Sequence, residues 1–382
     1  MNEEIGIEAL DWSGTGLTVR WRDGRVDRFA SLWLRDNRPE DRDPHSGQRL
    51  IDVADLPAEP TIRGARLHAG RLQVDWEGDE AGARFEVAWL RAHGPAAPPE
   101  PELLRSAWLE GARREARRDF AWLEFGALEA RGEARAHWLH RLLVEGIAFL
   151  GEVPTTEEGI LKAMRAVGRV AVTNYGEVFD VRSVPQPENL AYSDLGLGLH
   201  TDNPYREPVP GFQALHALVT SPDGGESLFA DGFALAEHLR EVAPAQFDCL
   251  TRTAVPFRYR SADAELYAER PLIQLSCTGT IAAVHYNNRS IAPLPLPAGA
   301  AERFYAAYRA FAALLREPRF QLRCRLRDGE LVVFDNQRIL HGRTAFSSAR
   351  HPRHLRGCYL TRDSVHSAAA QARRGRAARS QA

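Results

Sequence analysis

Cysteine is scarce in this chain. Four cysteines are scattered over 382 residues, and no two of them have the Cys-x-x-Cys spacing of a metal or redox motif. They are Cys249, Cys277, Cys324 and Cys358. This usage is typical of a cytoplasmic protein whose thiols are free and mostly buried.

A strong net charge and long apolar runs are also lacking. The 49 basic and 51 acidic side chains leave a net charge of −2, so there is no electrostatic case for binding nucleic acid or a membrane surface. No run of about 18 apolar residues occurs, so we expect no transmembrane helix. The N-terminal segment MNEEIGIEAL is acidic and has no apolar core, so we expect no signal peptide and a cytoplasmic location.

The composition is that of a soluble globular protein, with 44% hydrophobic and 26% charged residues. Residues 7–90 contain short segments in which apolar and charged residues alternate, with turns at Asp23-Gly24 and Gly78. The segment GPAAPPEPE at 94–102 is typical of a semi-rigid linker. We therefore predict a small β-rich N-terminal domain over 1–93, the linker over 94–102, a catalytic domain over 103–366 and a flexible tail over 367–382.

The predicted catalytic domain combines a few helices with many short strands. Helical spacing or composition predicts helices over 103–118, 129–146, 156–169, 233–248 and 300–315. GIAFLGEVP, which begins at Gly146, reads as a buried strand, and strand-like runs with Gly/Pro turns dominate from about 170 to 365. The predicted fold class is α+β, mostly β, with a double-sheet jelly roll as its catalytic domain.

One stretch, LGLHTDNPYREPVP, carries a possible metal site. His200 and Asp202 are two residues apart, so on an extended backbone their side chains lie on the same face. His341, which follows the strand-like run LVVFD, could supply a third ligand. Two histidines and one carboxylate form the facial triad of non-haem Fe(II) oxygenases. A His-x-Asp triplet is common by chance, so the prediction depends on this context.

Arginine and aromatic residues occur in or near the same segments as these ligands. Arg353 or Arg356 could grip a carboxylate through the planar guanidinium fork, although a solvated basic turn would have the same composition. Aromatic rings attract quaternary ammonium ions, although ordinary core packing would explain the same residues. The rings in question are Tyr175, Phe179, Tyr192, Tyr205 and Tyr359.

These segments resemble the γ-butyrobetaine hydroxylase branch of the taurine-dioxygenase-type Fe(II)/2-oxoglutarate oxygenases. The resemblance extends over nearly the whole chain. The matching stretches are LWLRDN (32–37), NYGEVFDVRS (174–183), ENLAYSDLGLGLHTDNPYREPVPGFQ (188–213), DGGESLFADGF (223–233), FDNQRILHGRTAF (334–346) and RHLRGCYLTRD (353–363).

The resemblance implies Fe(II), 2-oxoglutarate and O2 as cofactor and co-substrates, and it implies a homodimer. By position, His200, Asp202 and His341 would bind iron, and Arg353 would hold the distal carboxylate of 2-oxoglutarate. Tyr175, Tyr192 and Tyr359 match an aromatic cage for a trimethylammonium group, with Phe179 where some members have Trp. Asn189 and Asn288 fall near positions that hold the anionic end of the substrate.

The sequence departs from the family at a structural zinc site in the N-terminal module. The three cysteine positions are occupied by Arg38, Glu40 and Asp43, while a histidine appears at His93. Without thiolates, tight zinc binding is not expected.

The sequence also departs from the family at HYNNRS, residues 285–290. Arg289 beside Asn287 and Asn288 would make a donor-rich pocket that suits a phosphonate, unless Arg289 points into solvent. The leading substrate is therefore 2-(trimethylammonio)ethylphosphonate, hydroxylated next to phosphorus, followed by γ-butyrobetaine and then trimethyllysine. A metal-free jelly-roll binding protein and a zinc hydrolase on the same ligands are the alternatives of another class.

Overall fold

The computed structural model describes residues 6–96, 105–182, 195–347 and 353–381, and the side chains of helix α10 as far as 375. The chain divides after Glu102 into two compact units, Met1–Glu102 and Leu103–Ala382. Within the described ranges, no helix is long and apolar enough to cross a membrane.

The N-terminal unit consists of two three-stranded antiparallel sheets and two short helices. Its elements are β1 (Ile7–Ser13), β2 (Gly16–Trp21), β3 (Val26–Ala30), α1 (Ser31–Asp36), β4 (Ile62–His68), β5 (Arg71–Trp76), β6 (Asp79–Glu86) and α2 (Val87–His93). Alternate residues of β2 and β5 enter one core, as the alternating sequence predicts. The turns before β3 and β6 contain Gly24 and Gly78, both with positive φ. The alternating segments RVDRFASLWL (25–34) and ARFEVAWL (83–90) begin in strands β3 and β6 but continue as helices from Ser31 and from Val87.

The C-terminal unit is built on two sheets. The larger is seven-stranded, in the order β10-β21-β12-β19-β8-β7 with β9 on β21, and the smaller has the order β11-β20-β13-β18. The larger sheet contains β7 (Ala121–Glu124), β8 (Ile147–Gly151), β9 (Val170–Ala171), β10 (Phe179–Arg182), β12 (Phe212–Val219), β19 (Leu331–Asp335) and β21 (His354–Leu360). The smaller sheet contains β11 (Leu197–His200), β13 (Ser227–Asp231), β18 (Leu322–Cys324) and β20 (Ile339–Arg343). Side chains of both sheets share one core cluster, which is the arrangement of a jelly roll.

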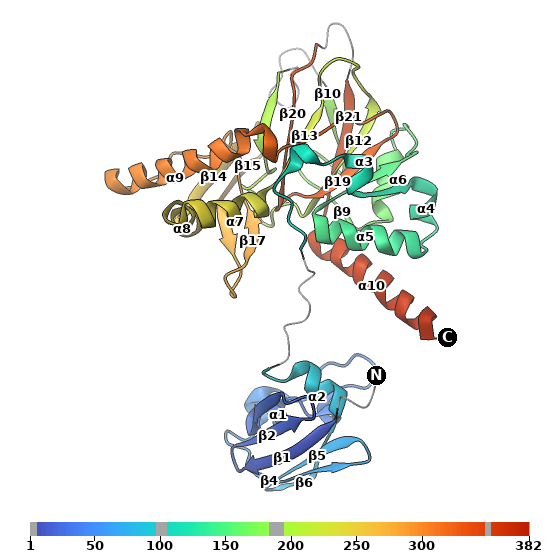
Figure 1. Ribbon diagram of the computed structural model, residues 1–382, viewed down its shortest axis with the longest axis vertical. Coiled ribbons are helices and arrows are strands. Elements are labelled where there is room, and N and C mark those ends of the chain that lie inside the picture. The colour runs from blue at the N-terminus through green and yellow to red at the C-terminus, as the bar shows by residue number, and fades with distance from the viewer. Residues whose placement is uncertain (1–5, 97–104, 183–194, 348–352, 382) are drawn as a thin grey trace. The chain divides into compact units, whose positions relative to one another are not determined.

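Both faces of the larger sheet are covered. Val332 and Phe334 of β19 enter the core between the sheets, whereas Leu331 and Val333 enter the core beneath the helices. This explains why LVVFD is continuously apolar and does not alternate. The covering helices are α4 (Phe125–Glu129), α5 (Glu133–Glu145), α6 (Gly159–Arg165) and α10 (Arg362–Gln381). Figure 1 shows α5 and α10 side by side along this face.

A third core joins three further helices to two hairpins, on the far side of the unit from α5 and α10 (Figure 1). Its elements are α7 (Gly232–Val242), α8 (Pro244–Arg252), α9 (Ala298–Arg316), β14 (Val255–Arg260), β15 (Glu265–Arg270), β16 (Ile273–Leu275) and β17 (Ile281–Val284). The helix predicted over 233–248 is therefore two helices, separated at Ala243. Pro244 opens the second helix because its missing N–H suits a first helical position.

One predicted helix is wrong in the described part of the chain. The helix predicted over 103–118 is reduced to the 3-10 turn η3 (Gly111–Arg113) and α3 (Ala116–Asp119). Trp108 is buried there, and its backbone N–H and indole N–H donate to Asp231 and to the Glu145 carbonyl. At the C-terminus, residues Arg362–Gln381 form helix α10, and its alanines at 368, 369 and 372 pack on the core beneath α5.

All four cysteines are free, but only two of them are buried. Cys324 and Cys358 are buried, Cys249 is half-buried and Cys277 is exposed.

Candidate metal centre and active site

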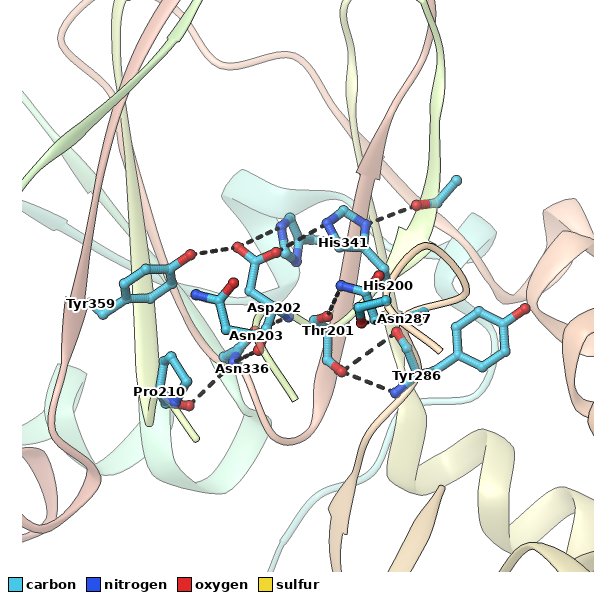
Figure 2. Close-up of polar contacts among 12 residues, drawn as sticks. His200, Thr201, Asp202, Asn203, Pro210, Tyr286, Asn287, Asn336, His341 and Tyr359 are labelled. Carbon is cyan, nitrogen blue, oxygen red and sulfur yellow. Dashed lines mark hydrogen bonds and ion pairs between the residues drawn. The ribbon is translucent and has the colours of Figure 1, made fainter. Parts of the chain in front are cut away.

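The three predicted metal ligands converge at the edge of the smaller sheet (Figure 2). His200 ends β11 and pairs in register with His341 of β20, which brings the ring centroids to 4.2 Å. Asp202 follows two residues later, with Oδ1 3.3 Å from His200 Nε2 and Oδ2 3.8 Å from His341 Nε2. One ligand atom from each residue lies within 4.8 Å of the others. This donor set fits Fe(II) in a facial triad.

Hydrogen bonds from distant segments hold the backbone between the ligands. Thr201 N–H donates to the Tyr286 carbonyl (2.8 Å), and Asn287 Nδ2 donates to the Thr201 carbonyl (3.0 Å). Asn336, which is fully buried, accepts from Asp202 N–H (2.7 Å) and donates to the Asp202 carbonyl (3.0 Å). Figure 2 shows these contacts around the Asp202 backbone. The ligands are therefore held in place by the protein itself.

The protonation states also suit a metal. Burial acts to raise the pKa of Asp202, but His341, His200 and the Tyr359 hydroxyl outweigh it and hold that pKa below the usual range. Burial and the adjacent His200 lower the pKa of His341 to about 3. His200 Nδ1 donates to the Gly198 carbonyl (2.9 Å), which leaves the lone pair on Nε2, facing Asp202. The carboxylate is thus ionised and His341 neutral at neutral pH.

A cavity of about 90 Å³ opens in front of the triad. The residues that line it include the three ligands and five other predicted site residues. These five are Tyr175, Phe179, Arg289, Arg353 and Tyr359. Asn189 and Tyr192 lie outside the described residues.

Two buried arginines lie together in this cavity. Arg353 donates from Nε to the Gly225 carbonyl (3.1 Å), and burial together with nearby Arg343 lowers its pKa to about 10, so it stays charged at neutral pH. Arg343 was not predicted, although its position two residues after His341 places both on one face of β20. Arg356 does not line the cavity; it donates to the Glu157 carbonyl and pairs with Asp180.

Aromatic rings form one wall of the cavity. The Phe179 centroid is 5.1 Å from that of Tyr359 and 6.4 Å from that of Tyr175. Gly357 makes room for this arrangement, since a Cβ there would lie 2.4 Å from the Phe179 ring. Tyr205 does not line the cavity; its hydroxyl lies 3.4 Å from that of Tyr175, which does.

Tyr259, which sequence reasoning missed, also stands behind this wall. It stacks on Tyr205 at 5.2 Å and meets Tyr175 at 6.0 Å. Nothing in the local sequence of β14 marks it, because only the fold brings this hairpin to the site.

Of the three predicted residues in the HYNNRS segment, two make hydrogen bonds within the protein and one lines the cavity. The Asn287 amide holds the Thr201 backbone, and Asn288 accepts from the Tyr308 hydroxyl (2.8 Å), so neither lines the cavity as expected. Arg289 does line it. Arg289 is exposed as a whole, yet burial of its guanidinium lowers its pKa, and the charge of Asp202 opposes that shift. Among the described residues its guanidinium has no hydrogen bond or ion pair.

The positions of the family zinc site have other partners in this chain. Arg38 donates to Asp79 (3.1 Å), and Glu40 accepts from the Arg84 backbone N–H (3.2 Å). Asp43 accepts from the Ser46 backbone N–H (2.6 Å), and His93 Nδ1 donates to the Trp89 carbonyl (2.8 Å). Each of the four residues therefore serves a local contact of the N-terminal unit.

Comparison with known proteins gives one consistent picture. A family model described as "Taurine catabolism dioxygenase TauD, TfdA family" matches residues 115–359. The chain is 36% identical to the gamma-butyrobetaine dioxygenase of Pseudomonas sp. (strain AK-1) over 359 residues, 92% of each protein. It is 30% identical to the mitochondrial trimethyllysine dioxygenase of Rattus norvegicus over 349 residues, 89% of this chain and 82% of that protein. It is 26% identical to the gamma-butyrobetaine dioxygenase of Homo sapiens over 367 residues, 94% of each.

The family model spans the triad, both arginines and the aromatic wall, and the relatives extend the likeness through the N-terminal unit. With the donor set described above, the chain belongs to the TauD/TfdA family and is an Fe(II)- and 2-oxoglutarate-dependent dioxygenase.

Proposed function

We propose that this dioxygenase hydroxylates an aliphatic C–H bond of a small trimethylammonium compound that carries an anionic end. The observation that supports this most is the composition of one cavity. Metal ligands, aromatic rings and a guanidinium without a partner in the described chain all face the same space. A substrate with a cation at one end and an anion at the other has a complementary group for each.

The cofactor and co-substrate have clear places in this proposal. Fe(II) held by His200, Asp202 and His341 would supply the oxidising chemistry with O2 as the oxidant. One oxygen atom would enter succinate as 2-oxoglutarate loses CO2, and the other would enter the hydroxyl group of the product. Arg353 is charged and buried, so it can hold the far carboxylate of 2-oxoglutarate. Arg343 adds a second positive charge to the same region.

The cationic end of the substrate is assigned to the aromatic wall. A trimethylammonium group has no N–H to donate, so the faces of Tyr175, Phe179 and Tyr359 are suitable partners. Their raised pKa values keep the Tyr175 and Tyr359 hydroxyls protonated; burial is the main cause for both. The wall therefore binds and orients the substrate without acting as a base.

The anionic end is assigned to Arg289, and this favours 2-(trimethylammonio)ethylphosphonate as the substrate. A phosphonate has three oxygens and up to two charges, which match a multi-donor guanidinium better than a carboxylate does. γ-Butyrobetaine, which would yield carnitine, is the second candidate because a relative 36% identical to this chain is named for it.

The test is a parallel assay of both compounds. The protein is loaded with Fe(II) and 2-oxoglutarate without oxygen, then exposed to oxygen, and succinate and hydroxylated product are measured by mass spectrometry. Product from the phosphonate, lost on Arg289→Ala with an unchanged KM for 2-oxoglutarate, is the expected result. Product from γ-butyrobetaine alone would assign the chain to carnitine synthesis, and turnover of neither would reject the proposed substrate class.

A homodimer in the cytoplasm completes the proposal. Light scattering coupled to size-exclusion chromatography measures the oligomeric state directly.

A further inference from the structure

We propose that Asn203 is a substrate-binding residue that donates a hydrogen bond from Nδ2 to the anionic end of the substrate, beside Arg289. This inference rests on the proposed function, because it needs a substrate with such an end. Neither the His-x-Asp motif nor the set of metal ligands gives a role to the Asn203 side chain.

The backbone at Asn203 is unusual and lies directly beside the metal site. Its φ is +55°, in the left-handed region, one residue after the metal ligand Asp202. Apart from glycine, asparagine and aspartate are the residues that adopt this conformation most readily. The residue is 5% exposed and borders the cavity. Strained backbone of this kind is often found at functional sites.

A hydrogen-bond chain gives one end of the Asn203 amide a partner. The Tyr205 hydroxyl donates to Oδ1 at 2.6 Å, and the Tyr175 hydroxyl lies 3.4 Å from that of Tyr205. Burial raises the pKa of Tyr205 to about 12, so its hydroxyl keeps the proton that it donates. Oδ1 is therefore occupied, and Nδ2 is the atom left for another partner.

Nδ2 has no partner among the described residues, although it is buried. Buried N–H groups without an acceptor are rare in folded proteins, and each calls for a specific explanation. A bound ligand that places an oxygen at this point would satisfy the donor. Gln213 also borders the cavity with an unpartnered buried atom, but that atom is the acceptor Oε1, which an anion would not approach.

The charges around Asn203 indicate which oxygen it binds. Arg289 lines the same cavity of about 90 Å³ as Asn203. Asn203 adjoins Asp202 in sequence and is hydrogen-bonded to Tyr205. A bound anion in this cavity therefore has both the Asn203 amide and the Arg289 guanidinium on its border. The other two arginines of the cavity, Arg343 and Arg353, are the ones assigned to 2-oxoglutarate.

Two variants remove the donor while tolerating the backbone. Asn203→Gly deletes the side chain, and Asn203→Asp keeps the shape and the acceptor for Tyr205 but replaces the N–H donors with a negative charge. Both residues accept a φ of +55°. Arg289→Ala serves as the matched variant for the other proposed anion ligand.

The experiment is anaerobic calorimetric titration of the full-length protein loaded with Fe(II) and 2-oxoglutarate. The probes are 2-(trimethylammonio)ethylphosphonate and γ-butyrobetaine, each paired with an analogue that lacks the anionic group, ethyltrimethylammonium or propyltrimethylammonium. For the bound zwitterion, we expect Asn203→Gly to raise Kd about 10- to 100-fold, as for the loss of a hydrogen bond to a charged group. Asn203→Asp should raise it further. The analogue and 2-oxoglutarate should each bind within about twofold of the wild-type affinity.

Each other outcome overturns the inference. Equal weakening of the zwitterion and its anion-free analogue would show that Asn203 only shapes the site. Weaker binding of 2-oxoglutarate alone would assign the donor to the co-substrate. Unchanged binding in both variants would remove the role altogether. If the wild-type protein binds neither zwitterion, the proposed function fails first, and this inference fails with it.

Discussion

Tyr359 belongs to the aromatic wall of the cavity and also contacts a metal ligand. Its ring lines the cavity against Phe179, while its hydroxyl donates to Asp202 Oδ2 at 2.8 Å. A hydrogen bond to a ligating carboxylate orients that ligand, and losing such a bond typically costs 10- to 100-fold in metal affinity.

Tyr359→Phe separates the two roles. Because the ring stays, binding of a trimethylammonium substrate should change by less than about twofold, whereas the Kd for Fe(II) or Co(II) should rise about tenfold or more. Anaerobic metal titration measures the second quantity. Tyr175→Phe is the control, since its hydroxyl contacts Tyr205 and has no contact with a metal ligand. Equal metal affinities in the two variants would contradict this role.

Arg353 and Arg356 are chemically alike but differ in position. The strand period places Arg353, Leu355, Gly357 and Tyr359 on one face of the chain, and Leu355 and Tyr359 do line the cavity. Arg356 has the opposite parity and contacts Glu157 and Asp180.

Arg353→Lys tests the assignment of the co-substrate. Lysine keeps a charge but loses the planar two-point contact, so KM for 2-oxoglutarate should rise about 10- to 100-fold. Arg356→Lys should leave KM for 2-oxoglutarate unchanged. The measurement is succinate release at varied 2-oxoglutarate, and a similar effect of both variants would reject the assignment.

At the scale of elements, one buried ion pair links the start of β20, the strand that carries His341, to the end of β13. Arg338, just before β20, forms two hydrogen bonds with Asp231, and the two side chains are 2% and 0% exposed. Arg338 also donates to the carbonyls of Val144 and Ser106. Asp231 caps helix α7 through the Phe233 N–H and accepts from the Trp108 N–H. Four of the five guanidinium N–H groups and both carboxylate oxygens of the pair are thus engaged.

Breaking this pair should be costly because it would leave a buried charge uncompensated. Arg338→Met should lower the free energy of unfolding by about 3 to 5 kcal/mol. The exposed pair of Arg252 and Asp248 on α8 provides the control, and Arg252→Met should change stability by less than about 1 kcal/mol. Urea unfolding followed by circular dichroism compares the two. A loss below 1 kcal/mol in Arg338→Met would show that the pair is not needed to hold β20.

At the scale of the whole molecule, buried neutral histidines make stability depend on pH. Burial lowers the pKa of His216 to about 4 and that of His285 to about 3. In the unfolded chain each has a pKa near 6.5, so between pH 6.5 and about 4 the unfolded state binds protons that the folded state does not. Stability is therefore complete above pH 6.5 and falls as the pH is lowered through this window.

Replacing His216, which lies fully buried on β12, should reduce this dependence. Between pH 7 and pH 5, the metal-free wild-type protein should lose about 2 kcal/mol more stability than His216→Leu, from about 1.4 kcal/mol per pKa unit. Urea unfolding at both pH values, with a chelator present, measures the difference. Parallel losses in the two proteins would mean that His216 does not titrate on unfolding.

Much of the site could be predicted because its chemistry is encoded in short segments. His200 and Asp202 lie on one face through the period of two, and the same parity links Arg353 to Tyr359 and would have linked His341 to Arg343. The alternating segments of the N-terminal unit and its Gly24 and Gly78 turns are equally local. By contrast, the helix expected over 103–118 failed because helical composition there yields to the tertiary contacts of Trp108.

By itself, the sequence determined which residues could bind a metal, a carboxylate and a cation, since residue type and strand parity are properties of the local chain. Only the tertiary structure decided how the polar residues of HYNNRS are used. Side chains in a turn do not alternate between two faces as they do in a strand, so the sequence could not show that Asn287 contacts the Thr201 backbone while Arg289 lines the cavity. It also decided that Asn336 holds Asp202 across 134 positions and that Tyr259 stands behind the aromatic wall. Such contacts join segments that are distant in sequence, and their partners are chosen by how the sheets pack.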